Sequence, residues 1–506
     1  MKTLSGLLLA LLCAASASAQ SSAFGMGTQL DAFIKKGMAD WQVPGLAIVV
    51  VKDGQTLVLK GYGVKDIQTK APVDEHTHFF IASNSKLFTG VALANLEQQG
   101  KLNLNDPVSK YFPDYRLYDS LSTRLVSIRD LLSHRIGTKT FQGDFTFWNT
   151  TLTRSQIMQR MRLLQPSAVF RQEYGYCNSC FMTAGEVIPK VTGLSWEQYV
   201  QDSLLNRLGM SNSFALSNGI ENRSKNIATP YTTSYSGQLK AVPYDRWDNL
   251  GPAASIVSTV TDLRQWLLCQ LDSGRLQGKQ VLPWATLRKT RMINVMTNST
   301  RSRMFPSNFT GYGLGVFAAD YNGHQVYWHT GGAAGMVSNV CFVPDQRLGI
   351  AILTNNDNQS FFEALRYQLL DYFLDVPYSN RSDAFLPGFK AELKQQLDEI
   401  AGWRKRVGNA APPLPLASYA GTYQHPLYGP LQLSVQGNVL ILQLPLHPSM
   451  TATLQYMDNN EWLLEYSNIE YGIFATRFRN NAQGRLVLSL PMNPFVEMDA
   501  YDFEKQ

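Results

Sequence analysis

The chain has 506 residues, of which 44% are hydrophobic and 17% charged, which is long enough for more than one globular domain. Its formal net charge is +6. Because basic and acidic residues are interleaved along the chain, this mild excess excludes the basic stripe of a nucleic-acid-binding protein. The five cysteines are too few at this length for a dense disulfide framework.

The first residues have the pattern of an export signal. Lys2 is followed by an apolar run over residues 7–12 and then by Ala17-Ser18-Ala19. A basic start, a short apolar core and small residues at the end are typical of a cleavable secretory signal, here residues 1–19. The run is too short to cross a bilayer, and no later run is longer. We therefore expect an exported protein, periplasmic or secreted, with no stable membrane insertion.

The elements that follow predict a sheet and a helical lobe. A first helix is expected over residues 28–40, and two β-rich runs around Asp53-Gly54 form a hairpin. From Ser83 to about residue 300 the pattern is mostly helical. Strand signals then return, followed by a helix over residues 361–373; the strands are expected at residues 311–316, 325–328, 337–343 and 348–354. One antiparallel sheet, with the helical middle as a separate lobe and a site in the cleft between them, is the expected arrangement.

The C-terminal part has a different pattern. A charged helix over residues 391–406 and a Pro-rich linker over residues 410–415 precede a series of short strands separated by polar turns. The strands are expected at residues 431–435, 439–444, 451–457, 462–466, 473–478, 486–490 and 496–503. This spacing predicts a small all-β barrel or sandwich, in which we find no catalytic constellation. The fold class is therefore α+β, with domains at 20–380 and 416–506 joined by residues 381–415.

A candidate nucleophile lies at the start of the helical lobe, in the sequence Ser83-Asn84-Ser85-Lys86. Residues three apart share one helix face, so Lys86 can reach the Ser83 hydroxyl. A Lys with the ordinary pKa of about 10 is already protonated, but the apolar helix that follows indicates burial, which lowers the pKa. Ser-x-x-Lys arises by chance about once or twice in a chain of this length, so the interpretation depends on partners further along.

Two later segments supply these partners: Tyr176-Cys177-Asn178, and His329-Thr330-Gly331-Gly332 at the end of a strand. With them the sequence resembles the penicillin-recognising serine hydrolases, specifically the superfamily of class C β-lactamases, D,D-peptidases and esterases. That superfamily carries Ser-x-x-Lys, Tyr-x-Asn and Lys/His-Thr-Gly in this order. The resemblance covers roughly residues 28 to 375 and implies a β-lactamase/transpeptidase-like antiparallel sheet flanked by helices, plus an all-helical lobe.

The resemblance also implies a role for each catalytic residue. Ser83 would attack a carbonyl and become acylated, with Lys86 and Tyr176 exchanging the proton as base and acid. Cations at Lys86 and His329 would lower the pKa of the phenol so that it can do this. The backbone N–H groups of Ser83 and Gly332 would hold the developing oxyanion.

The remaining residues of these segments would bind substrate. Asn178 would donate to the amide of the substrate and Thr330 to its carboxylate or an equivalent group, while Gly331 and Gly332 leave room along the strand edge. Two large aromatic-rich loops, residues 141–148 and 231–247, either wall the cleft or are packed surface. The C-terminal module resembles the lipocalin-like barrel appendages of some family members, which contribute to assembly or restrict access, so homo-oligomerisation through this barrel stays open.

Two departures from the family pattern bear on function. Cys177 replaces the usual Ser, and we interpret Cys177 and Cys180 as packing residues rather than a redox pair or a disulfide, although export permits oxidation. His329 replaces the Lys of class C β-lactamases and is only partly charged near neutral pH. We therefore expect an exported serine hydrolase acting through an acyl-enzyme on a peptide, amide or ester. A β-lactamase and a penicillin-binding sensor without turnover are the alternatives.

We expect no metal ion and no cofactor. His76 and His78 offer two ligands, but the sequence provides no third, so a structural role is favoured for both. His134 is expected to order a loop, because the segment around it resembles a structural segment of the family.

Overall fold

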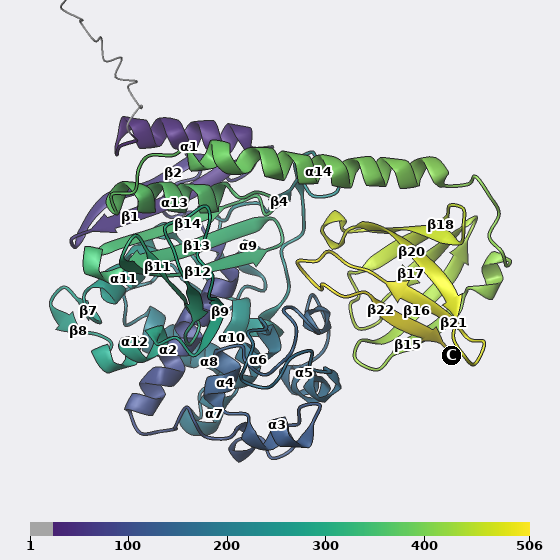
Figure 1. Ribbon diagram of the computed structural model, residues 1–506, viewed down its shortest axis with the longest axis horizontal. Helices are drawn as coiled ribbons and strands as arrows, with labels where there is room; N and C mark the ends of the chain where they lie inside the picture. The colour runs from purple at the N-terminus through teal and green to yellow at the C-terminus, as the bar shows by residue number, and fades with distance from the viewer. Residues whose placement is uncertain (1–23) are drawn as a thin grey trace, which may run out of the picture.

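The computed structural model describes residues 24–506, and the predicted export signal at residues 1–19 lies outside this range. Figure 1 shows a twisted sheet with helices on both faces, a helical lobe below it and a barrel to one side. The sheet has eight strands in the order β2-β1-β14-β13-β12-β11-β10-β9, and each neighbouring pair is antiparallel. The prediction of a single antiparallel sheet is therefore confirmed.

The strands of this sheet come from both ends of the first domain: β1 (Gly45–Lys52), β2 (Gln55–Gly63), β9 (Val295–Asn298), β10 (Thr310–Tyr312), β11 (Phe317–Tyr321), β12 (His324–Ala333), β13 (Met336–Val343) and β14 (Leu348–Thr354). Two-residue strands form three further pairs: β3 (Phe79–Phe80) with β6 (Val257–Ser258), β4 (Tyr231–Thr232) with β5 (Lys240–Ala241), and β7 (Arg275–Leu276) with β8 (Lys279–Gln280).

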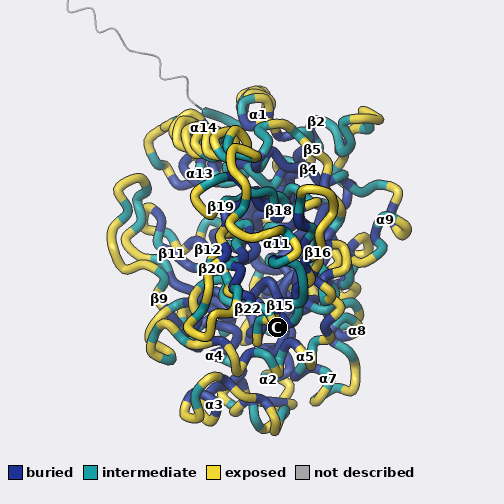
Figure 2. Tube along the Cα trace, turned by 90° about the vertical axis from the view of Figure 1, so that its right-hand side faces the viewer, coloured by how far each residue is buried: buried dark blue, intermediate teal, exposed yellow. Residues whose placement is uncertain are grey.

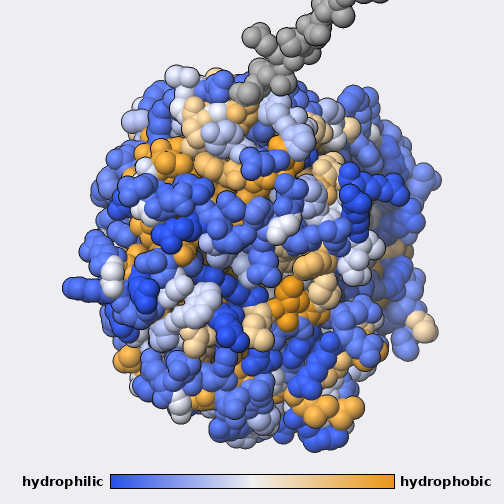
Figure 3. All heavy atoms as spheres, turned by 60° about the vertical axis from the view of Figure 1, so that its left-hand side comes forward, coloured by the Kyte–Doolittle hydropathy of each residue, from blue (hydrophilic) through white to orange (hydrophobic). Residues whose placement is uncertain are grey.

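The helices of the first domain are α1 (Thr28–Asp40), α2 (Ser85–Gln98), α3 (Ser120–Leu125), α4 (Ile128–Leu132), α5 (Arg154–Arg160), α6 (Asn178–Gly185), α7 (Val187–Thr192), α8 (Trp196–Val200), α9 (Ile220–Arg223), α10 (Gly251–Ala254), α11 (Val260–Leu271), α12 (Trp284–Arg291) and α13 (Phe361–Phe373). None of the helices between residues 24 and 506 combines the length and apolar character needed to span a bilayer. The face seen in Figure 3 is mainly hydrophilic, with apolar side chains in separate groups.

Strand β1 is buried on both faces because helices cover both sides of the sheet. Its even-numbered residues Leu46, Ile48 and Val50 belong to a core shared with α1 and α13, and its odd-numbered residues belong to the larger core that includes α2 and α11. This explains the continuous apolar run in the sequence. The hairpin turn to β2 is at Asp53-Gly54, whose φ values of 53° and 78° are the positive ones that such a turn requires.

One predicted strand is interrupted. We expected residues 311–316 to be continuous, but β10 ends at Tyr312 and β11 begins at Phe317. The turn between them packs on α2: a Cβ on Gly315 would lie 2.3 Å from the Lys86 carbonyl oxygen, and a Cβ on Gly90 would lie 2.0 Å from that of Leu314. Gly315 also has a φ of 90°, so this close approach requires glycine.

A long helix, α14 (Arg381–Arg406), leads from the sheet to the barrel and is largely exposed along its length (Figure 2). It begins ten residues before the predicted start, although Pro387-Gly388 is a pair that usually ends helices. The predicted domain boundaries at residues 380 and 415 stay predictions.

The C-terminal barrel is closed, with eight strands: β15 (Gly421–His425), β16 (Gly429–Gln436), β17 (Val439–Gln443), β18 (Thr451–Tyr456), β19 (Glu461–Tyr466), β20 (Ile473–Asn480), β21 (Leu486–Leu490) and β22 (Tyr501–Lys505). The sequence prediction missed β15, which closes the barrel against β22. The predicted strand at residues 496–503 was wrong in its first half, because residues 491–500 form a loop. This loop extends to the first domain.

Three buried carboxyl groups gather where the barrel meets the first domain. Asp245 and Asp357 accept hydrogen bonds from the backbone N–H groups of Ala334 and Gly335, at 2.8 and 3.0 Å, in the turn between β12 and β13. Glu470, from the barrel, has no hydrogen-bond partner on either carboxyl oxygen among the described residues. Burial raises the pKa of Asp245 to about 7 and that of Asp357 to about 6. Burial, and then the two neighbouring acids, raise the pKa of Glu470 well above its ordinary value.

This cluster predicts that stability falls as the pH rises. A carboxyl group whose pKa is raised on folding contributes its full stability below its unfolded pKa of about 4, and this is lost as the pH rises through the folded value. Glu470→Gln removes one such group. We expect it to raise the midpoint of thermal unfolding by roughly 2 °C or more at about pH 8 and to change it little at about pH 5.

Calorimetry at both pH values measures this difference, with Glu392→Gln, at an exposed position on α14, as the matched change of charge. An equal shift at the two pH values, or a lower midpoint at the higher one, would contradict the assignment.

Candidate active site

Ser83 and Lys86 lie at the junction of a 3₁₀ turn, Ala82–Asn84, and helix α2. Every residue of α2 from Ser85 to Leu96 is buried, so the helix passes through the core of the domain. Ala82, directly before the nucleophile, has a φ of 47°, a strained value for a residue with a side chain and one that occurs often at functional sites.

Three oxygen atoms surround the Lys86 amine. Its Nζ lies 3.0 Å from Ser83 Oγ, 2.6 Å from Asn178 Oδ1 and 2.9 Å from the carbonyl oxygen of Ala253 in α10. The side chain is fully buried, and this desolvation holds the pKa of Lys86 well below its usual value. The buried amine is therefore neutral or readily deprotonated.

The neutral amine is oriented as a base. It has two N–H donors and one lone pair. Asn178 Oδ1 and the Ala253 carbonyl can only accept hydrogen bonds from it, so these two contacts use both N–H groups. The lone pair then faces Ser83, whose hydroxyl donates to it. After proton transfer, the ammonium group has three donors for the same three oxygens, so the site accommodates both states.

Tyr176 stays a neutral phenol. Its ring lies 4.7 Å from Lys86 Nζ and 4.3 Å from the ring of His134, measured to the ring centroids. Burial raises the pKa of Tyr176, and the interaction with the Ser83 hydroxyl lowers it only in part. The expectation that Lys86 and His329 act as cations that lower this pKa is therefore wrong, because burial dominates. Tyr176 is suited to donate a proton rather than to take one.

His329 is neutral as well. Its Nδ1 lies 2.7 Å from the carbonyl oxygen of Thr330, which can only accept, so Nδ1 carries the proton. Its Nε2 then accepts from the hydroxyl of Tyr312 at 3.0 Å. Burial, followed by the proximity of Lys86, lowers the pKa of His329 to about 3. The imidazole thus places no positive charge at the site.

Asn178 is held between Lys86 and a residue that sequence reasoning missed. Its Nδ2 donates to Asp144 Oδ2, while its Oδ1 accepts from Lys86. We expected the amide to face the substrate, but these two contacts use it to orient the lysine. Asp144 is fully buried, and burial raises its pKa well above the ordinary value. Asp144 is the only acidic residue in the aromatic loop 141–148, and this feature of the sequence could have identified it.

Gly331 lets β12 approach the nucleophile. A Cβ on Gly331 would lie 2.0 Å from the carbonyl oxygen of Ile81 and 2.9 Å from the backbone nitrogen of Ser83. Only glycine allows this contact, and the next residue, Gly332, lines the same pocket as Ser83. Two backbone N–H groups at one pocket are what an oxyanion hole requires.

The predicted site residues meet at one pocket of about 360 Å³. Six of them line it: Ser83, Tyr176, Asn178, His329, Thr330 and Gly332. Lys86 lies behind Ser83, and Gly331 packs on the Ser83 backbone. Much of the remaining wall is aromatic: Phe141, Trp148, Tyr174, Trp247 and Phe317. Both aromatic loops therefore wall the cleft, which decides between the two interpretations of the sequence.

The barrel also contributes to this pocket. Phe495, in the loop 491–500, lies over Gly332, where a Cβ on the glycine would be 2.1 Å from the ring. Nearby Glu497 Oε2 accepts from the Gly143 N–H at 2.8 Å and from the Tyr428 hydroxyl at 2.6 Å. From the sequence, neither a catalytic constellation in the barrel nor the role of the loop 491–500 is predicted. Pro491, Asn493 and Pro494 are turn signals that could have identified the loop.

The other residues considered in the sequence have structural contacts. Cys177 and Cys180 are free and buried, with their sulfur atoms 2.7 Å apart. His134 accepts the Cys177 N–H on Nδ1 at 3.0 Å, and so orders the loop that carries Tyr176. The ring nitrogens of His78 lie within hydrogen-bond distance of the carbonyl oxygens of Asn226 and Asn212.

The family model "Beta-lactamase" matches residues 30–373, and a second model, "Domain of unknown function (DUF3471)", matches residues 405–505. The chain therefore belongs to the Beta-lactamase family. A structure titled "Structure of the octameric penicillin-binding protein homologue from Pyrococcus abyssi" has the same fold, with a TM-score of 0.60 and 22% identity. That alignment covers 94% of this chain and 99% of the other.

Two similar proteins illustrate the range of relatives. Protein flp of Staphylococcus aureus (strain MRSA252) is 26% identical over 68% of this chain, which matches about 66% of that protein's length. The unguisins hydrolase ungD' of Aspergillus campestris is 27% identical over 79% of this chain and 76% of that protein. The relatives thus include a hydrolase.

The geometry predicts different effects for the base and the acid. We expect Lys86→Met to slow acylation by about 100-fold or more with any substrate, because no other group replaces the base. Tyr176→Phe is expected to slow amide hydrolysis by a similar factor but p-nitrophenyl ester hydrolysis far less, because nitrophenolate leaves without a proton. Single-turnover rates with one amide and one matched ester measure both effects. A Tyr176→Phe variant that slows both reactions equally would make the phenol the base.

Proposed function

We propose that the protein is an exported serine hydrolase that forms an acyl-enzyme on Ser83 with an uncharged amide, peptide or ester. The observation that carries this proposal is the fully buried amine of Lys86, 3.0 Å from the Ser83 hydroxyl oxygen at the base of an aromatic pocket. Membership of the Beta-lactamase family and the presence of a hydrolase among the relatives support it. Export rests on the signal pattern at residues 1–19.

Acylation follows from the positions of these groups. Lys86 Nζ takes the proton of Ser83 Oγ as this oxygen attacks the carbonyl carbon, and the N–H groups of Ser83 and Gly332 stabilise the oxyanion. When the tetrahedral intermediate collapses, the Tyr176 hydroxyl gives its proton to the leaving nitrogen or oxygen. The resulting phenolate recovers a proton from the Lys86 ammonium group, which restores the neutral amine.

Deacylation reverses these roles with water in place of the leaving group. The neutral amine of Lys86 takes a proton from water as the water oxygen attacks the acyl carbon, and the Lys86 ammonium group then gives a proton to Ser83 Oγ as this oxygen leaves. The products are a carboxylic acid and the free enzyme. All proton transfers occur between Ser83, Lys86, Tyr176, the substrate and water, so the cycle needs no reactant other than water.

The charge of the pocket favours neutral substrates. No Arg, Asp, Glu or Lys is among the residues that line it, and His329 is neutral. A substrate carboxylate placed there would lose its hydration without gaining a cation, which is costly. The penicillin-type substrates of the family carry a carboxylate, and for this reason efficient β-lactam hydrolysis ranks second.

The first test is the identity of the nucleophile. We expect Ser83→Ala to abolish both turnover of p-nitrophenyl butyrate and labelling by a fluorophosphonate probe, whereas Ser299→Ala, at an exposed serine, keeps both. Labelling is read by intact mass. A Ser83→Ala variant that still takes up the probe would contradict the proposed function.

The second test is substrate charge. We expect kcat/KM for p-nitrophenyl butyrate to exceed that for the p-nitrophenyl monoester of succinic acid, which has a carboxylate at the end of its acyl chain, by about tenfold or more. The same comparison is made between neutral and acidic amides. If the enzyme preferred the anionic substrate of either pair, a cation would have to lie at the pocket, which would contradict the proposed neutral pocket.

The third test concerns the barrel. Phe495 is half exposed and contacts the pocket through its ring, so its removal opens space over Gly332 without emptying a core. We expect Phe495→Ala to raise the kcat/KM ratio of octanoate to acetate esters by about tenfold, the scale of a few methylene groups in an apolar pocket. Met498→Ala, on the same loop and 60% exposed, is the control. An unchanged ratio would mean that Phe495 does not limit the acyl group.

A further inference from the structure

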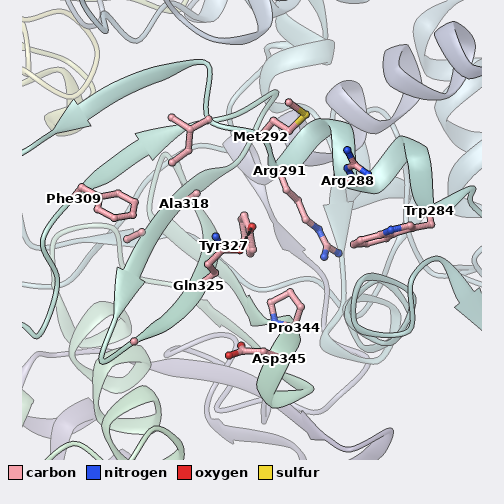
Figure 4. Close-up of a pocket in the computed structure, with 13 residues that line it drawn as sticks. Trp284, Arg288, Arg291, Met292, Phe309, Ala318, Gln325, Tyr327, Pro344 and Asp345 are labelled. Atoms are coloured by element: carbon pink, nitrogen blue, oxygen red, sulfur yellow. Dashed lines mark hydrogen bonds between the residues drawn. The ribbon is translucent and has the colours of Figure 1, made fainter.

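A second cavity lies away from the catalytic pocket and shares none of its lining residues (Figure 4). It has a volume of about 620 Å³ and is formed by α12, by strands β11 and β12, and by the turn after β13. Three of its lining residues are small: Ala318, Ala319 and Gly323. The volume is within the range of about 300 to 1,000 Å³ that is usual for small-molecule sites.

Large apolar side chains are grouped around this cavity although they are exposed to solvent. They are Trp284, Met292, Ile293 and Phe309, with exposed fractions of 43%, 54%, 39% and 37%. Single exposed apolar residues are common, but several around one hollow are typical of a binding site. Two of them are aromatic and lie on different sides of the cavity in Figure 4.

One charged group of the cavity is the buried guanidinium of Arg291. Arg291 is only 7% exposed, and among the described residues it forms no ion pair with a carboxylate. One terminal nitrogen donates to the carbonyl and side-chain oxygens of Gln270, at 2.6 and 2.9 Å, while Nε has no hydrogen-bond partner. A buried charge is normally paired, so this guanidinium has unused capacity for an anion.

The groups around Arg291 do not neutralise its positive charge. Its guanidinium carbon lies 5.1 Å from the ring centre of Trp284 and 5.6 Å from that of Tyr327, and the group is seen between these rings in Figure 4. A second guanidinium, that of Arg288, also lines the cavity. The acid there, Asp345, is already within 2.6 Å of His324 Nδ1. The cavity thus combines two cations with one engaged acid.

We propose that this cavity binds a small carboxylate with an aromatic body. The carboxylate is placed at the Arg288 and Arg291 guanidinium groups, where it accepts charge-assisted hydrogen bonds from their terminal nitrogens. The aromatic body lies against Trp284. This inference does not depend on the proposed reaction, because the two sites share no residue.

Calorimetric titration of the full-length protein carrying Ser83→Ala, so that the amide is not hydrolysed, with 3-phenylpropionate and with its uncharged amide tests the proposal. We expect the acid to bind about tenfold more tightly than the amide, the scale of one charge-assisted hydrogen bond. Arg288→Gln and Trp284→Ala, at exposed positions that should not affect folding, are each expected to weaken binding of the acid by about fivefold or more. Arg291→Gln is expected to abolish it.

Two controls make the result specific. Arg275→Gln removes an exposed guanidinium elsewhere, and Phe495→Ala alters the catalytic pocket; both should bind the acid as the wild type does. Equal affinity for acid and amide would overturn the proposal, as would wild-type binding by Arg288→Gln and Trp284→Ala. Loss of binding in Phe495→Ala would overturn it too, by locating the acid in the catalytic pocket. Failure of Ser83→Ala to abolish turnover would affect only the proposed function.

Discussion

The structure depends on keeping the amine of Lys86 out of water. In solution this group holds a proton at neutral pH and cannot act as a base. Burial removes the hydration that stabilises the ammonium ion, and α2 provides it by having twelve consecutive buried residues from Ser85 to Leu96. Glycines at positions 90 and 315 let the turn between β10 and β11 close over this helix. Much of the core around α2 therefore acts to lower the pKa of a single group, the Lys86 amine.

A neutral amine is useful only if its lone pair points at the nucleophile, and here a chain of hydrogen bonds sets that direction. Asp144 holds Asn178, Asn178 holds one N–H of Lys86, and the carbonyl of Ala253 holds the other. The loop that carries Asp144 is in turn fixed by Glu497, which accepts from Gly143. The barrel thus reaches the catalytic site twice, through Glu497 on this loop and through Phe495 over the pocket.

The parts of this site that could be predicted are those with a local pattern. Ser-x-x-Lys, Tyr-x-Asn and His-Thr-Gly each have fixed spacing, and the apolar β1 predicts a strand covered on both faces. The direction in which the pKa of Tyr176 shifts could not be predicted. It depends on how many groups surround the ring, and the spacing of residues in the sequence does not contain this information. Phe495 escaped for a related reason. It lies in the loop 491–500, which reaches the first domain, and only residues 501–503 of the predicted strand belong to a barrel strand, β22.

Long-range packing also explains the elements whose limits were wrong. The apolar residues 311–316 have the composition of a strand, yet the chain turns within them because it must pass the carbonyl of Lys86. Helix α14 continues through Pro387-Gly388 although these residues favour a break. In both places tertiary contacts outweigh local preference, which amounts to about 1 kcal/mol for glycine and about 3 for proline in a helix.

The two cavities show that one physical effect can leave one group neutral and another positively charged. Burial lowers the pKa of His329 from its ordinary value to about 3, and it lowers that of Arg291 to about 10. The shifts have the same sign and the same main cause. Because imidazole starts near neutrality and guanidinium starts far above it, the first loses its proton at neutral pH and the second keeps it. A histidine at the catalytic pocket and an arginine at the second cavity therefore separate a neutral polar surface from a cationic one within a single domain. In the catalytic pocket, a neutral histidine gives no electrostatic attraction for carboxylates. At the second cavity, the burial seen here leaves the arginine charged, so the attraction for carboxylates remains.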